Sequence, residues 1–155
     1  MDYILGSVDM KISTRGRYGL MAMVDLAFYY GECKNLMSIA KRQGLSEAYL
    51  EQLIIPLKKA GFVEGTRGAQ GGYCLSRPPT AITAGEILKA LEGSLYPVDC
   101  LSGEEGASCG TANCDLCATK SLWFKMYDRM NDLLESVTLA DLVRDYQGKD
   151  KFKTI

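Results

Sequence analysis

The chain has 155 residues, enough for one compact domain with an added element but too few for two full domains. Hydrophobic residues make up 47% of it and charged residues 24%, values typical of a globular protein. The sequence contains neither an apolar run of the roughly 20 residues that span a membrane nor the pattern of a secretory signal. We therefore expect a cytoplasmic protein without a membrane partner.

Histidine is absent, which removes the commonest general base and the usual partner of a catalytic serine or cysteine. We therefore expect neither an enzyme nor a small-molecule substrate. The net charge of −1 hides an asymmetry, because residues 10–80 hold ten Lys or Arg against five Asp or Glu, whereas residues 81–155 hold eight against twelve. A basic first half beside an acidic second half suits a nucleic-acid-binding module joined to a sensing or assembly element.

Apolar periodicity predicts mainly helices in the first part of the chain. The predicted elements are, in order, a detachable leader over 1–9, a helix over 14–30, a short helix over 39–43 and a third helix over 47–60. Ser38 and Ser46 are expected to cap the second and third helices, and Gly44 to end the second. Gly44 to Ser46 would then be the turn between two helices.

Two short apolar runs on either side of a glycine-rich segment predict a β-hairpin with Arg67 near its tip. The remaining predicted elements are strands over 62–65 and 72–76, a helix over 84–91, a loop over 94–119, a helix over 120–137, a short helix from Thr138 to Val143 and a flexible tail over 148–155. The helix over 120–137 carries an apolar stripe that needs a partner surface.

Three helices followed by a hairpin predict a mainly α protein with a small β-hairpin wing, a winged helix-turn-helix over 10–80. The polar start of the third helix suits base edges in the major groove, and an arginine at the wing suits a narrow minor groove. The candidate DNA-binding residues are Lys11, Ser13, Arg15 and Tyr18 around the first helix, Ser38, Ser46, Tyr49, Glu51 and Gln52 in the helix-turn-helix, and Arg67, Gly68 and Gly71 in the wing. Lys58 and Lys59 are either solvated helix charges or phosphate contacts.

The stretch Lys-Ile-Ser-Thr-Arg-Gly-Arg-Tyr-Gly-Leu-Met-Ala-Met from Lys11 resembles the first helix of the IscR and NsrR regulators. The stretches Gly-Leu-Ser-Glu-Ala-Tyr-Leu-Glu-Gln-Leu at 44–53 and Arg-Gly-Ala-Gln-Gly-Gly-Tyr at 67–73 resemble the same family. The resemblance covers nearly all of the chain after residue 9.

The resemblance implies a homodimer, crossed by its long C-terminal helix, that binds double-stranded DNA at a pseudo-palindromic operator. It also implies that Tyr49, Glu51 and Gln52 face bases and that Arg67 serves the wing. Residues 81–147 would then form the dimerisation helices. The alternative to DNA binding is a helical domain in which the glycines only make turns.

Four of the six cysteines, Cys100, Cys109, Cys114 and Cys117, cluster with the spacing C-x8-C-x4-C-x2-C. The segment around them has few apolar residues, so a bound metal can supply its order. Four thiolates hold either an iron-sulfur cluster or a closed tetrahedral zinc ion, and a CxxC pair can instead be a redox dithiol. The spacing alone does not separate zinc from iron-sulfur.

The resemblance favours the cluster, because IscR and NsrR carry three cysteines in the corresponding loop and bind iron-sulfur, with two irons in IscR and four in NsrR. It implies Cys100, Cys109 and Cys117 as ligands, and a 2Fe-2S cluster is favoured over a 4Fe-4S cluster although the cluster type stays open. Lys120 stands where IscR has a histidine ligand, and Cys114 is additional to the family set. The fourth ligand therefore stays open.

These features together predict a DNA-binding transcription regulator that senses iron-sulfur cluster status and controls genes of cluster assembly. The alternatives are a DNA-binding regulator with a structural zinc site and, from another class, a cysteine redox enzyme. Cys33 and Cys74 lie outside the cluster, and both are expected to be small buried hydrophobes.

Overall fold

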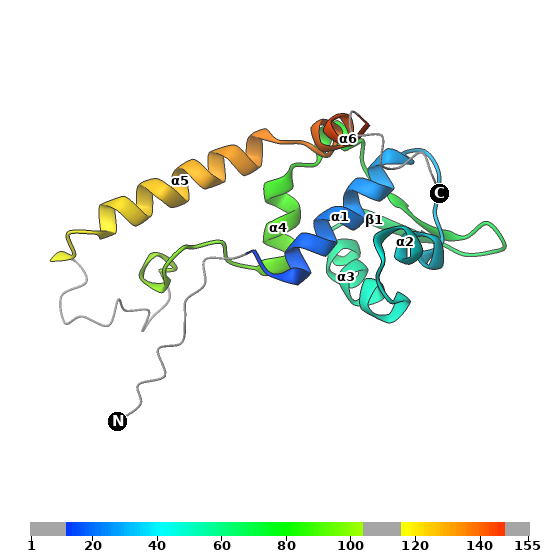
Figure 1. Ribbon diagram of the computed structural model, residues 1–155, viewed down its shortest axis with the longest axis horizontal. Helices are drawn as coiled ribbons and strands as arrows, with labels where there is room; N and C mark the ends of the chain where they lie inside the picture. Colours follow the sequence, from blue (N-terminus) through cyan, green and yellow to red (C-terminus); the bar gives the residue numbers. More distant parts are fainter. Residues whose placement is uncertain (1–11, 104–115, 148–155) are drawn as a thin grey trace, which may run out of the picture.

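The computed structural model describes residues 12–103 and 116–147 (Figure 1). In chain order the elements are α1 (Thr14–Phe28), α2 (Leu36–Gln43), α3 (Glu47–Lys59), β1 (Val63–Thr66), β2 (Gly72–Leu75), the 3₁₀ turn η1 (Pro79–Ala81), α4 (Ala84–Glu92), the 3₁₀ turn η2 (Asp99–Leu101), α5 (Lys120–Ser136) and α6 (Leu139–Gln147). The two strands pair antiparallel, with Val63 opposite Leu75. The predicted mainly α fold with a hairpin wing is confirmed.

The helix-turn-helix forms as its local signals predict. Gly44 ends α2 in the left-handed conformation at φ 66°, and Ser46 caps α3 by accepting a hydrogen bond from the Tyr49 backbone N–H at 3.2 Å. Pro56 lies inside α3 without ending it. One face of α3 is buried, and it consists of Leu50, Leu53, Ile54 and Leu57.

A single apolar core joins these helices to the later part of the chain. Met23 and Leu26 of α1, Ile87 of α4 and Leu139 of α6 all belong to this core and are buried. α1 is the central helix, because it packs against α2, α3, α4 and α6. α3 is held in place by α1, α2 and α4, whereas the face of α3 opposite its buried residues remains open.

The start of α2 differs from the prediction. The cap is Asn35 rather than Ser38: the Asn35 Oδ1 accepts a hydrogen bond from the Ser38 backbone N–H at 2.7 Å. Ser38 lies in the first turn, where its hydroxyl donates to the Asn35 carbonyl at 2.9 Å. Asn35 takes this role because its neighbour Lys34 is held in an extended strand-like pairing, so that Asn35 enters the helix from an extended conformation.

That pairing adds a short third segment to the hairpin. Lys34 and Tyr73 exchange two backbone hydrogen bonds, Lys34 N to Tyr73 O at 2.9 Å and Tyr73 N to Lys34 O at 2.8 Å. The approach is so close that a Cβ at Gly72 would overlap the backbone of Lys34 and Asn35. Glycine at position 72 is therefore needed for the contact between β2 and the segment that leads into α2.

α4 and α6 begin side by side. Thr83 and Thr138 form an antiparallel bridge, and each is the first residue of a capping box, with Glu86 and Asp141 as the respective acidic partners. The predicted cap at Thr138 is confirmed, but the last helix extends beyond Val143 to Gln147. The longer helix packs back on the body, since the rings of Tyr146 and Phe28 lie 6.0 Å apart, edge to face.

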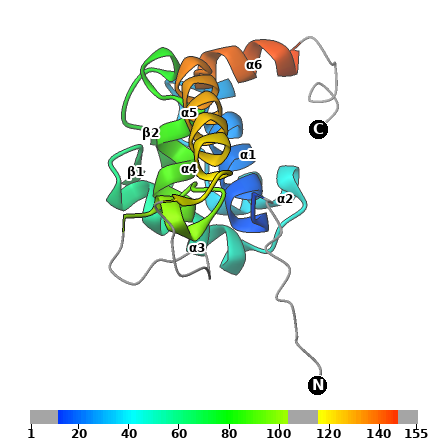
Figure 2. The same ribbon diagram turned by 90° about the vertical axis from the view of Figure 1, so that its left-hand side faces the viewer.

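α5 projects away from the rest of the molecule (Figure 1), and it is the nearest element in the end view of Figure 2. None of its residues is buried. The large apolar side chains of Leu122, Phe124 and Leu133 are 57%, 59% and 62% exposed. Within the part of the chain that the structure describes, no helix is long and apolar enough to cross a membrane.

Candidate nucleic-acid interface and cysteine loop

The open face of α3 carries polar side chains next to one exposed apolar side chain. Glu51 and Gln52 are exposed, as the prediction of base contacts requires, and Ile55 follows them on the same face with 61% of its surface exposed. Gln suits adenine, Glu suits the amino group of cytosine, and an apolar side chain suits the thymine methyl group. Sequence reasoning missed Ile55, although its spacing of three residues from Gln52 was a usable signal.

The side chains of Tyr49 and Tyr18 pack against the core more than they line the open face of α3. Both are half-buried against the apolar core, and their rings meet edge to face at 6.2 Å between centroids. This contact joins the start of α3 to α1. The Tyr18 side chain that was assigned to phosphate therefore also fixes the position of the predicted recognition helix.

The wing tip is exposed at Arg67, and Gly68 adopts φ 111° there. Gly71 donates its backbone N–H to the Gly68 carbonyl at 2.9 Å, and a Cβ at Gly71 would meet that carbonyl oxygen at 2.8 Å. The turn itself thus requires the small residue at position 71. The glycines give the tip its shape whether or not DNA approaches it.

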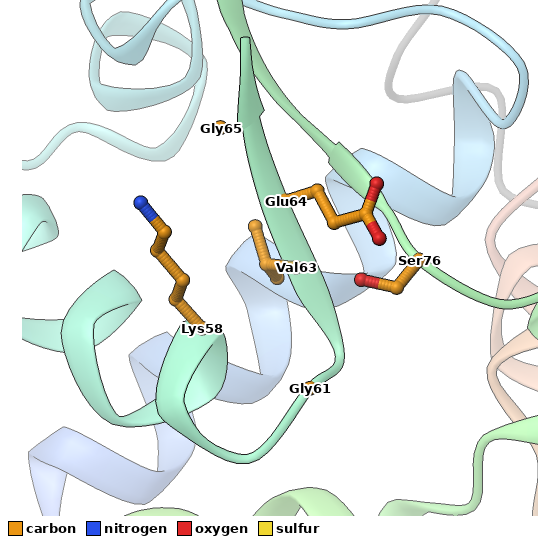
Figure 3. Close-up of a pocket in the computed structure, with 6 residues that line it drawn as sticks. All are labelled: Lys58, Gly61, Val63, Glu64, Gly65 and Ser76. Carbon is orange, nitrogen blue, oxygen red and sulfur yellow. The ribbon is translucent and has the colours of Figure 1, made fainter.

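A hollow of about 430 Å³ separates the end of α3 from the wing. Figure 3 shows Lys58 reaching from α3 along β1 toward Gly65, whereas the Glu64 carboxylate lies on the other side of the strand, near Ser76. The ammonium group of Lys58 is thus placed between the predicted recognition helix and the wing. Of the two lysines left open by the sequence, Lys58 has the better position for a phosphate contact.

The remaining candidate DNA-binding residues, around the start of α1 and at Ser38, differ in exposure and in their hydrogen bonds. Ser13 caps α1 by accepting from the Gly16 backbone N–H at 3.2 Å, and its hydroxyl donates to the Glu92 carboxylate at 2.5 Å. Arg15 is exposed and open to solvent. Ser38 is half-buried, with its hydroxyl turned to the Asn35 carbonyl. Lys11 lies outside the described residues.

A buried charge pair fixes α2 against α1. Asp25 is 2% exposed and accepts hydrogen bonds from Arg42 Nε at 2.9 Å, from its terminal Nη2 at 2.7 Å and from Gln43 Nε2 at 3.1 Å. The hydrogen bond with Asp25 raises the pKa of Arg42 above its usual value. Arg42 is therefore a structural cation, although its place in the helix-turn-helix would allow a DNA contact.

The structure places two of the four clustered cysteines. Cys100 lies in η2 and Cys117 precedes α5, with its Sγ 3.2 Å from the Thr119 hydroxyl. Leu101 and Cys117 border one hollow of about 450 Å³ together with Lys120 of the first turn of α5. Cys109 and Cys114 lie outside the described residues. Within 12–103 and 116–147, no three side chains of the metal-binding types converge.

Cys33 and Cys74 are not the buried hydrophobes that the sequence predicted, because both side chains are only half-buried. They come from distant parts of the chain, one before α2 and the other in β2. The prediction was wrong because the strand-like pairing of Lys34 with Tyr73 carries both cysteines to the edge of the hairpin.

A helix-turn-helix with an exposed polar face on its second helix, followed by a hairpin wing with an arginine at its tip, defines a winged-helix DNA-binding regulator. Residues 12–145 match the model of the Rrf2 family, described as an iron-dependent transcriptional regulator. The chain belongs to the Rrf2 family.

Two kinds of relative stand out. The HTH-type transcriptional regulator CymR of Bacillus subtilis (strain 168) is 46% identical over 143 residues, which are 92% of this chain and 96% of the relative. The IscR of Erwinia tasmaniensis is 37% identical over 139 residues, covering 89% of this chain and 81% of the relative. The structure of T. potens IscR is similar with a TM-score of 0.73 and 43% identity, covering 96% of each chain. These relatives are transcription regulators and not enzymes.

Proposed function

We propose that this regulator is a homodimer that reads a pseudo-palindromic operator and adjusts its binding to the state of an iron-sulfur cluster held by its clustered cysteines. The observation that carries the proposal is the hollow bordered by Leu101, next to Cys100, and by Cys117. It brings together the two ends of the cysteine-rich segment, at the end of α5 that lies far from the wing in Figure 1.

The donor set suits such a cluster. Thiolates are the usual ligands of iron-sulfur clusters, and Cys100, Cys109 and Cys117 supply three of them, with Cys114 as the fourth candidate. A bound cluster would supply redox-sensitive ligation that is lost under oxidation or iron scarcity. Lys120 borders the hollow and would place a positive charge beside the anionic thiolates. A 2Fe-2S cluster is favoured over 4Fe-4S, and a structural zinc ion is the alternative occupant.

On the DNA side, Gln52 and Glu51 would contact bases and Lys58 a backbone phosphate between α3 and the wing, with Arg67 in the adjacent minor groove. Ile55 would pack against a thymine methyl group. The cysteine segment can influence this surface only if its ordered form favours one arrangement of the two DNA-binding modules over another. α5 connects the two regions directly, because it starts at the cysteine segment and ends at the body beside α4.

The proposal is tested by anaerobic purification, followed by visible spectroscopy and by iron, sulfide and zinc quantification per chain. We expect a coloured protein with matched iron and acid-labile sulfide, and loss of both in the C100A/C117A variant without loss of its helical circular-dichroism signal. The variant should also select a different set of duplexes from a pool of genomic fragments. A colourless protein with one zinc per chain would contradict the sensor and leave a DNA-binding protein with a structural metal.

The genes under control are the second part of the proposal. The IscR relatives and the iron-dependent description of the family favour genes of iron-sulfur assembly. A second candidate comes from CymR, the global cysteine regulator of B. subtilis, which is 46% identical to this chain. The fragments selected by the purified protein separate the two, because operators upstream of cysteine metabolism genes would favour the second candidate.

A further inference from the structure

Cys33 and Cys74 are brought face to face by the backbone. The reciprocal hydrogen bonds between Lys34 and Tyr73, at 2.9 and 2.8 Å, define a hydrogen-bonded antiparallel pair. One residue further along, Cys33 is opposite Cys74 in a non-hydrogen-bonded pair. In such pairs the Cα atoms are about 4.5 Å apart and the side chains leave the same face. That separation is within the range of about 4.4–6.8 Å that a disulfide spans.

The two thiols also contact each other. Cys74 is hydrogen-bonded to Cys33, and burial first and this hydrogen bond second raise the pKa of the Cys74 thiol to about 11. Cys74 therefore stays protonated at neutral pH. The Cys74 Sγ also lies 3.9 Å from the Glu64 carbonyl oxygen, on the neighbouring strand. Both cysteines are half-buried and therefore within reach of a small reagent.

We propose that Cys33 and Cys74 are a redox dithiol that a hydroperoxide converts to an intrachain disulfide, separately from the clustered cysteines. The Cys33 thiolate attacks one peroxide oxygen and the O–O bond breaks, which gives a Cys33 sulfenic acid and releases water after protonation. The Cys74 sulfur then attacks the Cys33 sulfur, the S–O bond breaks and a second water leaves with the Cys74 proton. In sum, two thiols and hydrogen peroxide give one disulfide and two waters.

The bond would join the segment that precedes α2 to β2 of the wing. The covalent ring from Cys33 to Cys74 contains α2, α3 and β1, and hence the whole helix-turn-helix together with Arg67. A link across a loop of this length removes conformational freedom from the unfolded chain, so the oxidised protein should melt several degrees higher. A dithiol reductant should reverse the shift.

The test is differential alkylation after brief exposure of the purified, reduced full chain to hydrogen peroxide. Trypsin should release the peptides 18–34 and 68–89 joined as one species, since the Arg77–Pro78 bond resists cleavage, and dithiothreitol should separate them. C33S should abolish the joined species and the rise in melting temperature. C74S should leave a Cys33 sulfenic acid that a dimedone probe captures. Circular dichroism of both variants checks their folds.

Two results would overturn the proposal. One is full N-ethylmaleimide labelling of Cys33 and Cys74 in peroxide-treated protein under conditions that oxidise other cysteines of the chain. The other is attachment of Cys74 to a clustered cysteine or to a second chain instead of to Cys33. The readout is a covalent bond between Cys33 and Cys74. The result of this test therefore does not depend on the proposed cluster or on the operator.

Discussion

At the scale of single residues, the proposed base contact and the proposed phosphate contact of α3 lie at different places. Gln52 is exposed on that face, whereas Lys58 reaches into the hollow beside the wing (Figure 3). A side chain that reads a base contributes to one sequence only, and a lysine on a phosphate contributes to all sequences through release of bound counterions. Truncation of Gln52 and truncation of Lys58 should therefore weaken DNA binding in different ways.

Q52A should lose about 1–3 kcal/mol of binding on the duplex selected from genomic fragments and almost nothing on an unrelated duplex. K58A should weaken both duplexes alike and reduce the slope of log K against log salt by about 1. Fluorescence anisotropy across a series of salt concentrations measures both effects. R144A removes an exposed cation on α6 and serves as the matched control, which should change neither. Equal losses for Q52A on both duplexes would refute a base contact.

The residue scale also shows where sequence reasoning was sufficient. The cap at Ser46 and the exposed positions of Glu51, Gln52 and Arg67 could be predicted because helix caps, helix faces and hairpin tips leave local signals. The exposure of Ile55 was missed because an apolar residue next to the buried Leu53 and Ile54 is expected to belong to the core. The position of Cys33 next to Cys74 was inaccessible, because it depends on a strand-like pairing between segments some 40 residues apart, and the signal for it is only the small residue at Gly72.

At the scale of elements, α5 contacts α4 through Glu135, near the C-terminal end of α5. Lys89 donates to Glu135 at 2.6 Å and the Thr83 hydroxyl donates to the same carboxylate at 3.0 Å. The hydrogen bond from Lys89 lowers the pKa of Glu135, with a smaller contribution from Thr83. A Cβ at Gly85 would also meet this carboxylate at 2.8 Å, so α4 and α5 approach closely here.

E135Q should destabilise the fold by less than about 1 kcal/mol at neutral pH, since the Glu135 and Lys89 side chains are 40% and 42% exposed and solvent screens the pair. The pKa of Glu135 is lower in the folded state, so its contribution is complete above the unfolded value near 4.3 and disappears as the pH falls through the folded value. Urea unfolding at neutral pH and at a series of acidic pH values measures the difference. A difference that persists unchanged in acid would rule out the ion pair as its source.

The elements that were predicted less well share one cause. Asn35 and Ser38 are both good helix caps three residues apart, and only the tertiary pairing of Lys34 decides between them. α6 continues past Val143 because Tyr146 packs on Phe28 across the molecule. Local propensity thus fixed the type and order of the helices, whereas contacts between distant residues set their ends.

At the scale of the whole molecule, the apolar side chains of α5 need a covering surface, and a second copy of the chain is the proposed one. L133D replaces a side chain that is 62% exposed in the single chain. Burial of a leucine is worth about 1.5–3 kcal/mol, and a symmetric dimer contains it twice, so dissociation should become easier by on the order of 100-fold or more.

Light scattering coupled to size exclusion, over a dilution series, measures this change in association. D132N alters the neighbouring exposed position without adding charge to an apolar surface and should remain associated like the parent protein. If L133D and the parent have the same mass at every concentration, α5 is not the dimer contact.

α5 contacts the rest of the chain near its C-terminal end, through Glu135, and again in its middle, where the rings of Tyr127 and Tyr96 stack at 4.5 Å between centroids. Its 17 residues extend about 25 Å at 1.5 Å per residue, with the contact to α4 near one end and the cysteine segment at the other. Rotation of a rod of this length by about 10° around its C-terminal end displaces its N-terminal end by about 4 Å and requires the stack between Tyr127 and Tyr96 to open. Conversely, a rearrangement of a few ångströms at Cys117 corresponds to only a small rotation where α5 joins the body. Under the proposed coupling, a movement of α5 would reach the body through the contacts of Glu135 with Thr83 and Gly85 and through the stack of Tyr127 on Tyr96.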